Sequence, residues 1–67
     1  MYSQEDIQAM SVAEIRDSLD LFFGDFGPDL LQKTAELLKQ GVLTWEQVET
    51  VVGLGPGEGL DALIGGL

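Results

Sequence analysis

The sequence predicts a small all-α protein. Three main helices are expected at about residues 12–23, 28–40 and 45–52, with a short N-terminal turn or helix before them and a Gly-rich apolar tail after them. Apolar residues recur at three- and four-residue spacing within each range. Residues that cap helices stand at or near the starts of the ranges, and glycines stand just after their ends. A chain of 67 residues is long enough for one domain at most.

The helix over residues 28–40 has the clearest boundaries. Pro28 suits the first helical position, where its missing N–H needs no partner, and Asp29 favours the positive end of the helix dipole. Gly41 can adopt the left-handed conformation that ends a helix without strain. The apolar stripe of this helix consists of Leu30, Leu31, Thr34, Leu37 and Leu38. We expect this face to be buried.

The next helix, over residues 45–52, follows a connection of only two residues. Thr44 is a good N-cap and Gln47 lies three residues later, which is the pattern of a capping box. Leu43 can pack on Val48 as a hydrophobic staple. The apolar side of this helix consists of Trp45, Val48, Val51 and Val52. Because the connection is so short, the two helices are expected to form a helical hairpin.

This hairpin also resembles a known family. The order Leu-x6-Leu-Leu-x2-Gly-Val-Leu-Thr-x-Glu-Gln-Val, within residues 30–52, is similar to the short C-terminal domain called SHOCT. The residues that match its signature directly are Gly41, Leu43, Thr44 and Glu46. Val48 stands where the family usually carries Phe. The resemblance implies a small oligomerisation or protein-contact module without catalytic residues.

The N-terminal part of the chain carries two more capping patterns. Ser11 and Glu14 form the pattern that begins the helix at about residue 12, and Ser3 with Asp6 offers a similar start for a short turn or helix through Met10. The apolar stripe of the helix over residues 12–23 consists of Val12, Ile15, Leu19, Phe22 and Phe23.

The aromatic residues have two possible roles. Phe22, Phe23 and Phe26 crowd the space between two helices and are interpreted as core, because large aromatic side chains dominate small cores. The alternative is that one of them, together with Trp45, is an exposed anchor for a partner. Trp45 lies in the first turn of its helix. It fits the core and an exposed partner-binding anchor equally well, because aromatic residues are common hot spots in protein interfaces.

The composition changes after Gly53, so we divide the chain into a helical domain, residues 1–53, and a tail, residues 54–67. Glycines and Pro56 disfavour a helix in the first half of the tail, and Leu60 to Ile64 could form one weak turn. The tail should be mobile when free. It is too apolar for a solvated linker, however, so we expect it to fold back or to dock on a partner.

The charge balance limits the partners. Twelve acidic residues stand against Arg16, Lys33 and Lys39, a net charge of −9 that repels nucleic acid and anionic lipid. A charged partner should therefore be basic, although acidic residues can also serve solubility alone. No apolar run approaches the length of a membrane span, and the acidic N-terminus differs from a signal peptide. We expect a cytoplasmic protein.

The residue types argue against an enzyme. The chain has no cysteine and no histidine, so common nucleophilic and zinc-binding constellations cannot form. The acidic residues Asp17, Asp20, Asp25 and Asp29 do not have the spacing of a calcium-binding EF-hand. We therefore expect no catalytic residue, no cofactor and no metal.

Two functions remain open. The favoured one is an interaction or assembly module, such as an adaptor, a small subunit or a viral accessory or structural protein, which binds a partner protein or its own copies. The expected contact residues are Trp45, Val48, Val52, Leu54, Leu60, Leu63, Ile64 and Leu67. The alternative is a precursor peptide, in which a modifying enzyme binds the helical leader and acts on the Gly-rich tail.

Overall fold

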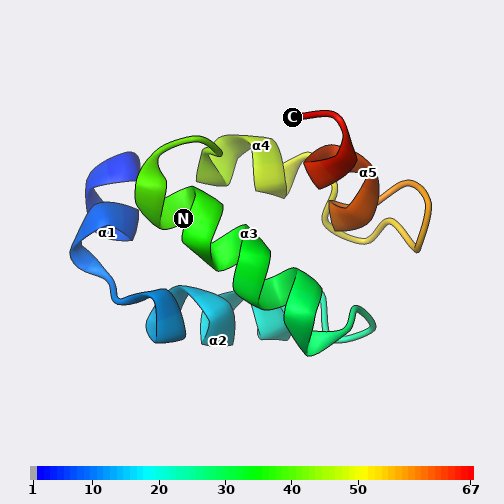
Figure 1. The fold of residues 1–67 in the computed structure, drawn as a ribbon, viewed down its shortest axis with the longest axis horizontal. Coiled ribbons are helices and arrows are strands. Elements are labelled where there is room, and N and C mark those ends of the chain that lie inside the picture. Colours follow the sequence, from blue (N-terminus) through cyan, green and yellow to red (C-terminus); the bar gives the residue numbers. More distant parts are fainter. Residues whose placement is uncertain (1) are drawn as a thin grey trace.

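The computed structural model describes residues 2–67, which form five helices and no strand. The helices are α1 (Gln4–Ala9), α2 (Val12–Phe22), α3 (Pro28–Gln40), α4 (Trp45–Glu49) and α5 (Leu60–Gly65). Helix α3 runs through the middle of the molecule, with α1 at one end, α2 along one side, and α4 and α5 on the other side (Figure 1). The predicted all-α fold class is confirmed.

Helix α3 has the predicted boundaries. Pro28 is its first residue, and Gly41 ends it with a left-handed backbone conformation at φ 81°. The N–H of Val42 then donates to the carbonyl oxygen of Leu37 at 3.1 Å, so one of the last carbonyls of the helix gains a partner. The boundaries agree because the signals that set them act within a few residues.

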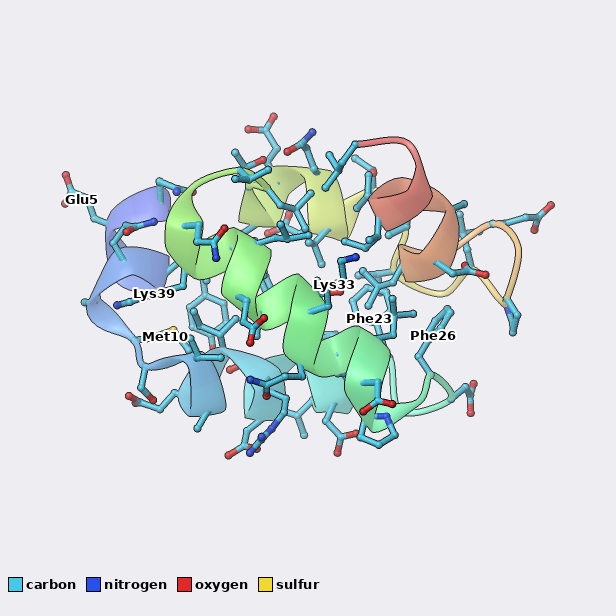
Figure 2. All side chains as sticks on the ribbon, in the orientation of Figure 1. Glu5, Met10, Phe23, Phe26, Lys33 and Lys39 are labelled. Carbon is cyan, nitrogen blue, oxygen red and sulfur yellow. The ribbon has the colours of Figure 1, made fainter. Side chains whose placement is uncertain are left out.

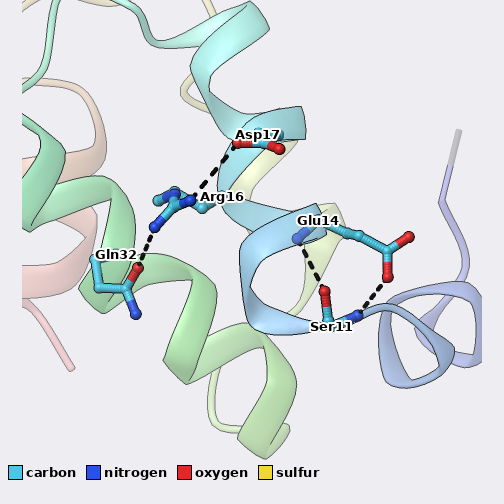
Figure 3. Close-up of polar contacts among 5 residues, drawn as sticks. All are labelled: Ser11, Glu14, Arg16, Asp17 and Gln32. Atoms are coloured by element: carbon cyan, nitrogen blue, oxygen red, sulfur yellow. Dashed lines mark hydrogen bonds and ion pairs between the residues drawn. The ribbon is translucent and has the colours of Figure 1, made fainter.

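Capping boxes begin α1, α2 and α4. The pairs are Ser3 with Asp6, Ser11 with Glu14, and Thr44 with Gln47. In the second pair, Ser11 N donates to Glu14 Oε1 at 3.0 Å and Glu14 N donates to Ser11 Oγ at 3.1 Å (Figure 3). Each box satisfies two backbone N–H groups that have no partner inside the helix.

The core contains residues from every helix. Its fully or almost fully buried apolar members are Ile7, Ile15, Leu19, Phe23, Leu31, Ala35, Leu38, Leu43, Trp45, Val48 and Leu60. Burying a side chain of the size of leucine stabilises a fold by about 1.5–3 kcal/mol. Thr34 is also buried, and its hydroxyl donates to the carbonyl oxygen of Leu30 at 2.7 Å, so this polar group is satisfied.

Helix α2 ends one residue earlier than predicted, and this changes the position of one aromatic residue. Phe23 is the C-cap and is buried, whereas Phe22 is 48% exposed. The residues that point towards α3 are Ile15, Leu19 and Phe23, which lie four residues apart on one row. Phe22 lies about 100° away from Phe23 around the helix axis, so the expectation that it belongs to the core is wrong.

Helix α4 is shorter than the predicted range of 45–52. After Glu49 the backbone continues in turns, with Val51 N bonded to the carbonyl of Val48 at 3.1 Å. The Thr50 hydroxyl donates to the Gln47 carbonyl at 2.6 Å. Thr50 and the two valines after it are β-branched, and such residues lower the stability of a helix because their χ1 angles are restricted.

Residues 54–67 fold back onto the rest of the chain. They contain α5, which packs against α3, and Leu60 is fully buried in the common core. The expected weak turn at residues 60–64 is therefore a helix, Leu60–Gly65. Phe23 and Phe26 lie together beside this segment, with ring centroids 6.0 Å apart (Figure 2). The tail thus shares one core with residues 2–53.

Gly59 allows this close packing. A Cβ atom at this position would lie 2.7 Å from Cζ of Phe26 and 2.9 Å from the carbonyl oxygen of Leu54. Next to it, the Gly57 N–H donates to the Asp61 carboxylate at 2.7 Å and closes the loop before α5. Of the glycines that disfavour a helix in this loop, Gly59 is therefore the one that allows the close contact with Phe26 and Leu54.

We predict that Gly59→Ala lowers the free energy of unfolding by about 1–3 kcal/mol, because the methyl group overpacks the contact with Phe26. Gly55→Ala is the matched control, since a Cβ there meets no atom within 4 Å. The control should stay within about 0.5 kcal/mol of the parent. Urea unfolding followed by circular dichroism measures both. Equal stability of the two variants would contradict this account of the loop.

We also predict that two of the capping boxes make stability sensitive to acid. The backbone N–H of Ser3 and of Ser11, followed by the serine hydroxyls, hold the pKa of Asp6 and of Glu14 below their ordinary values of 3.8 and 4.5. A lowered pKa contributes stability that is complete above the ordinary value and is lost as the pH falls through the lowered value.

The variant Asp6→Asn with Glu14→Gln should therefore lose less stability than the parent between pH 7 and pH 3. An amide can occupy this position without titrating, as Gln47 does in α4. The control is Asp25→Asn with Glu58→Gln, which removes the same charge at positions that cap no helix. Thermal unfolding at pH 7, 4.5 and 3 compares the three proteins. If the capping variant and the control respond equally, the capping carboxylates are not the cause.

Candidate functional site

An apolar groove crosses the surface where α1, α2 and α4 meet. Its wider part is an open hollow of about 700 Å³, lined by Tyr2, Asp6, Ala9, Met10, Leu21, Phe22 and Trp45. A second hollow of about 270 Å³ is lined by Phe22, Trp45, Glu49 and Val52. The two hollows share Phe22 and Trp45 and therefore adjoin each other at these residues. We call them together the aromatic groove.

Trp45 lies between the two hollows and is held by aromatic neighbours. The capping box of α4 fixes it as the first residue of that helix. The ring of Tyr2 meets the indole edge to face, with centroids 5.0 Å apart, and the ring of Phe22 lies 6.1 Å away. Such pairs add about 0.5–1.5 kcal/mol each beyond the burial of their area. Tyr2 is also held by a 3.2 Å hydrogen bond between its hydroxyl and that of Ser18.

The indole N–H of Trp45 is buried and has no hydrogen-bond partner among the described residues. An unpaired buried donor typically costs about 1–3 kcal/mol. Phe at this position would fill much of the same space without that cost. The hydrophobic core alone therefore gives no reason for tryptophan here.

Helix α1, which forms one side of the groove, is fastened by Lys39 of α3. The Lys39 ammonium donates to the carbonyl oxygens of Gln8 and Met10, at 2.5 and 2.7 Å (Figure 2). In return, the Gln8 amide donates to the carbonyl oxygen of Leu38 at 3.3 Å. Because α1 has no basic residue in its own last turn, Lys39 supplies the positive charge that favours a helix C-terminus.

The charged residues that line the groove are both acidic. Asp6 lies on the α1 side and Glu49 on the α4 side. Asp6 is ionised at neutral pH, as any aspartate is whose pKa does not exceed the ordinary value of 3.8. Lys39 is engaged with α1, and Arg16 donates to the Gln32 side chain at 3.1 Å and lies 3.9 Å from Asp17 (Figure 3). The groove thus combines an apolar floor with negative charge and can bind apolar groups that carry cations beside them.

Three of the expected contact residues are almost completely buried. They are Trp45, Val48 and Leu60, at 3%, 0% and 0% exposure. Val48 and Leu60 therefore face the protein's own core, contrary to expectation, because α4 and α5 fold back towards α3. Trp45 is a core residue that also lines the groove.

The other expected contact residues retain some exposure. Val52 is 43% exposed and lines the smaller hollow. Leu54 and Leu67 are 44% and 56% exposed but line neither hollow, and Leu63 and Ile64 are partly buried against the core. Of the eight expected residues, only Trp45 and Val52 belong to the aromatic groove.

The groove residues Tyr2, Met10 and Leu21 were not identified from the sequence, and Phe22, one of three phenylalanines considered as an exposed anchor, was interpreted as core. Leu21 is the most informative of these because it is 83% exposed. It does not fit the apolar stripe of α2, and a large apolar residue off the stripe of an amphipathic helix indicates a second apolar surface. That signal was present in the sequence next to Phe22.

The described residues show neither a metal-binding cluster nor a membrane-spanning helix. Among residues 2–67, no group of three or more acidic side chains is arranged to hold a metal ion. In the same part of the chain, no helix combines the length and the apolar character that crossing a bilayer requires. Comparisons of the chain with models of protein families, with curated proteins and with solved structures return no match.

Proposed function

We propose that the chain is a non-catalytic interaction protein, and that the aromatic groove binds a partner protein that presents an apolar side chain beside basic residues. One observation carries the proposal. Leu21 and Phe22, 83% and 48% exposed, line the same open hollow as Trp45. Concave apolar surfaces on soluble proteins commonly serve as contact sites.

The energetics of the groove support binding. Complete burial of a leucine or phenylalanine side chain is worth about 1.5–3 kcal/mol. Leu21 is 83% exposed and contributes little of this to the isolated fold, and Phe22 is 48% exposed and contributes only part of it. Aromatic side chains in the centre of an interface are the usual hot spots. A partner that covers the groove would bury Leu21, Phe22 and the edge of Trp45 together, with Asp6 and Glu49 near the rim.

The packing of residues 54–67 favours this function over a precursor peptide. A modifying enzyme would have to withdraw Leu60 from the core and open the contact between Gly59 and Phe26 before it reached this segment. The resemblance of residues 30–52 to the SHOCT domain, which implies a protein-contact module, agrees with the same proposal. A role as adaptor, small subunit or viral accessory protein, and a cytoplasmic location, remain parts of it.

We expect a photo-crosslinking phenylalanine analogue at position 21 to capture one discrete protein in the cells that produce this chain. Adding Phe22→Ala should reduce that product at least several-fold, because the variant removes a neighbouring apolar contact of the groove. The same analogue at position 42 is the matched control, since Val42 is 56% exposed but lines neither hollow. Mass spectrometry identifies the product. Equal products at positions 21 and 42, or a product unaffected by Phe22→Ala, would contradict the proposal.

A further inference from the structure

We infer that the occupant of the aromatic groove is an amphipathic α-helix whose apolar stripe is flanked by lysine or arginine. This inference rests on the proposed function and specifies the partner. It follows from three properties of the groove: the backbone groups around it, the sign of its charge, and the arrangement of its two hollows.

The first property is that the groove offers few backbone partners. An extended peptide needs hydrogen bonds from an exposed strand edge, and residues 2–67 contain no strand. The lining residues lie in or next to helices, so the groove lacks the regular row of free N–H and C=O groups that a strand edge offers, and the N–H groups of Met10 and Val52 are already bonded to the carbonyls of Ile7 and Glu49. An α-helix satisfies its own backbone and can therefore lie on such a surface without leaving polar groups unpaired.

The second property is charge. The charged lining residues, Asp6 and Glu49, are acidic, and one lines each hollow. The chain as a whole carries a net charge of −9. A second copy would bring the same charge onto these carboxylates, and like charges at an interface are unfavourable. Basic residues on either side of an apolar stripe complement the groove.

The third property is the arrangement of the hollows. Spaces of about 700 Å³ and 270 Å³ meet at Phe22 and Trp45. One face of a helix presents large side chains three, four and seven residues apart. Successive anchors of this kind can enter both hollows while the helix lies across the ring of Phe22.

Trp45 makes the inference directly measurable. It is the single tryptophan of the chain and it lines both hollows, so its fluorescence reports occupancy of the groove. The probes are synthetic 18-residue peptides without tryptophan that share one leucine stripe. The stripe is flanked by lysine in the first peptide, by glutamine in the second and by glutamate in the third. A fourth peptide has the lysine sequence with two central prolines, which break the helix.

We expect the lysine-flanked peptide to shift Trp45 emission and to bind roughly five- to tenfold more tightly than the glutamine-flanked peptide, as two surface ion pairs would allow. The glutamate-flanked and proline-containing peptides should bind at least tenfold more weakly than the lysine-flanked one. Raising the salt concentration should reduce the advantage of lysine. In Asp6→Asn with Glu49→Gln, the lysine and glutamine peptides should bind equally.

Leu21→Ser with Phe22→Ala tests whether binding occurs in the groove, and Val42→Ser is its control. The first variant should weaken binding of the lysine-flanked peptide at least tenfold, and the second should leave it unchanged. Equal affinity of the lysine and glutamine peptides, or of the helical and proline peptides, overturns the inference about the partner but leaves the groove as a binding site. If Leu21→Ser with Phe22→Ala leaves binding of the lysine-flanked peptide unchanged, both the inferred partner and the proposed binding site are overturned. The same holds if the chain associates with itself through the groove, in a concentration-dependent way, and this association excludes the peptides.

Discussion

The buried face of α3 is the constraint on which the rest of the structure depends. Helices α1, α2 and α5 all pack against it, and its residues Leu31, Ala35 and Leu38 lie in the core (Figure 1). A chain of this size has little apolar area to bury, so one shared core is more stable than two small ones. This explains why the apolar C-terminal segment folds inwards, since Leu60 adds one more fully buried side chain to the core.

The aromatic groove is unusual for so small a protein, because it leaves large apolar side chains outside the core. In a small core nearly every large apolar residue is needed, yet Leu21 and Phe22 remain at the surface while Phe23 is buried. Around them, Lys39 of α3 fastens α1, the Thr44 capping box positions Trp45, and Tyr2 covers the indole. Contacts from distant parts of the chain therefore maintain an apolar surface that has acidic side chains in its lining.

Much of the fold was predictable, and the candidate site was largely not. Ser11, Gly41 and Thr44 mark helix boundaries correctly because capping and chain reversal depend on a few neighbouring residues. Val48 and Leu60 were expected to contact a partner because they are apolar and belong to a short helix and a Gly-rich segment. Their burial depends on where α3 lies, and no local pattern contains that information.

The sequence by itself determined the helical class, the start of every helix before the tail, and the acidic character that limits the partners. Only the tertiary structure decided which apolar residues stay exposed. Phe22 and Phe23 are adjacent and chemically identical, and they differ only in which side of α2 faces α3. Trp45 is almost completely buried, and one residue that covers its ring is Tyr2, which is remote in the sequence. Helix ends follow from local hydrogen bonding, whereas exposure follows from packing between segments that the chain brings together only when it folds.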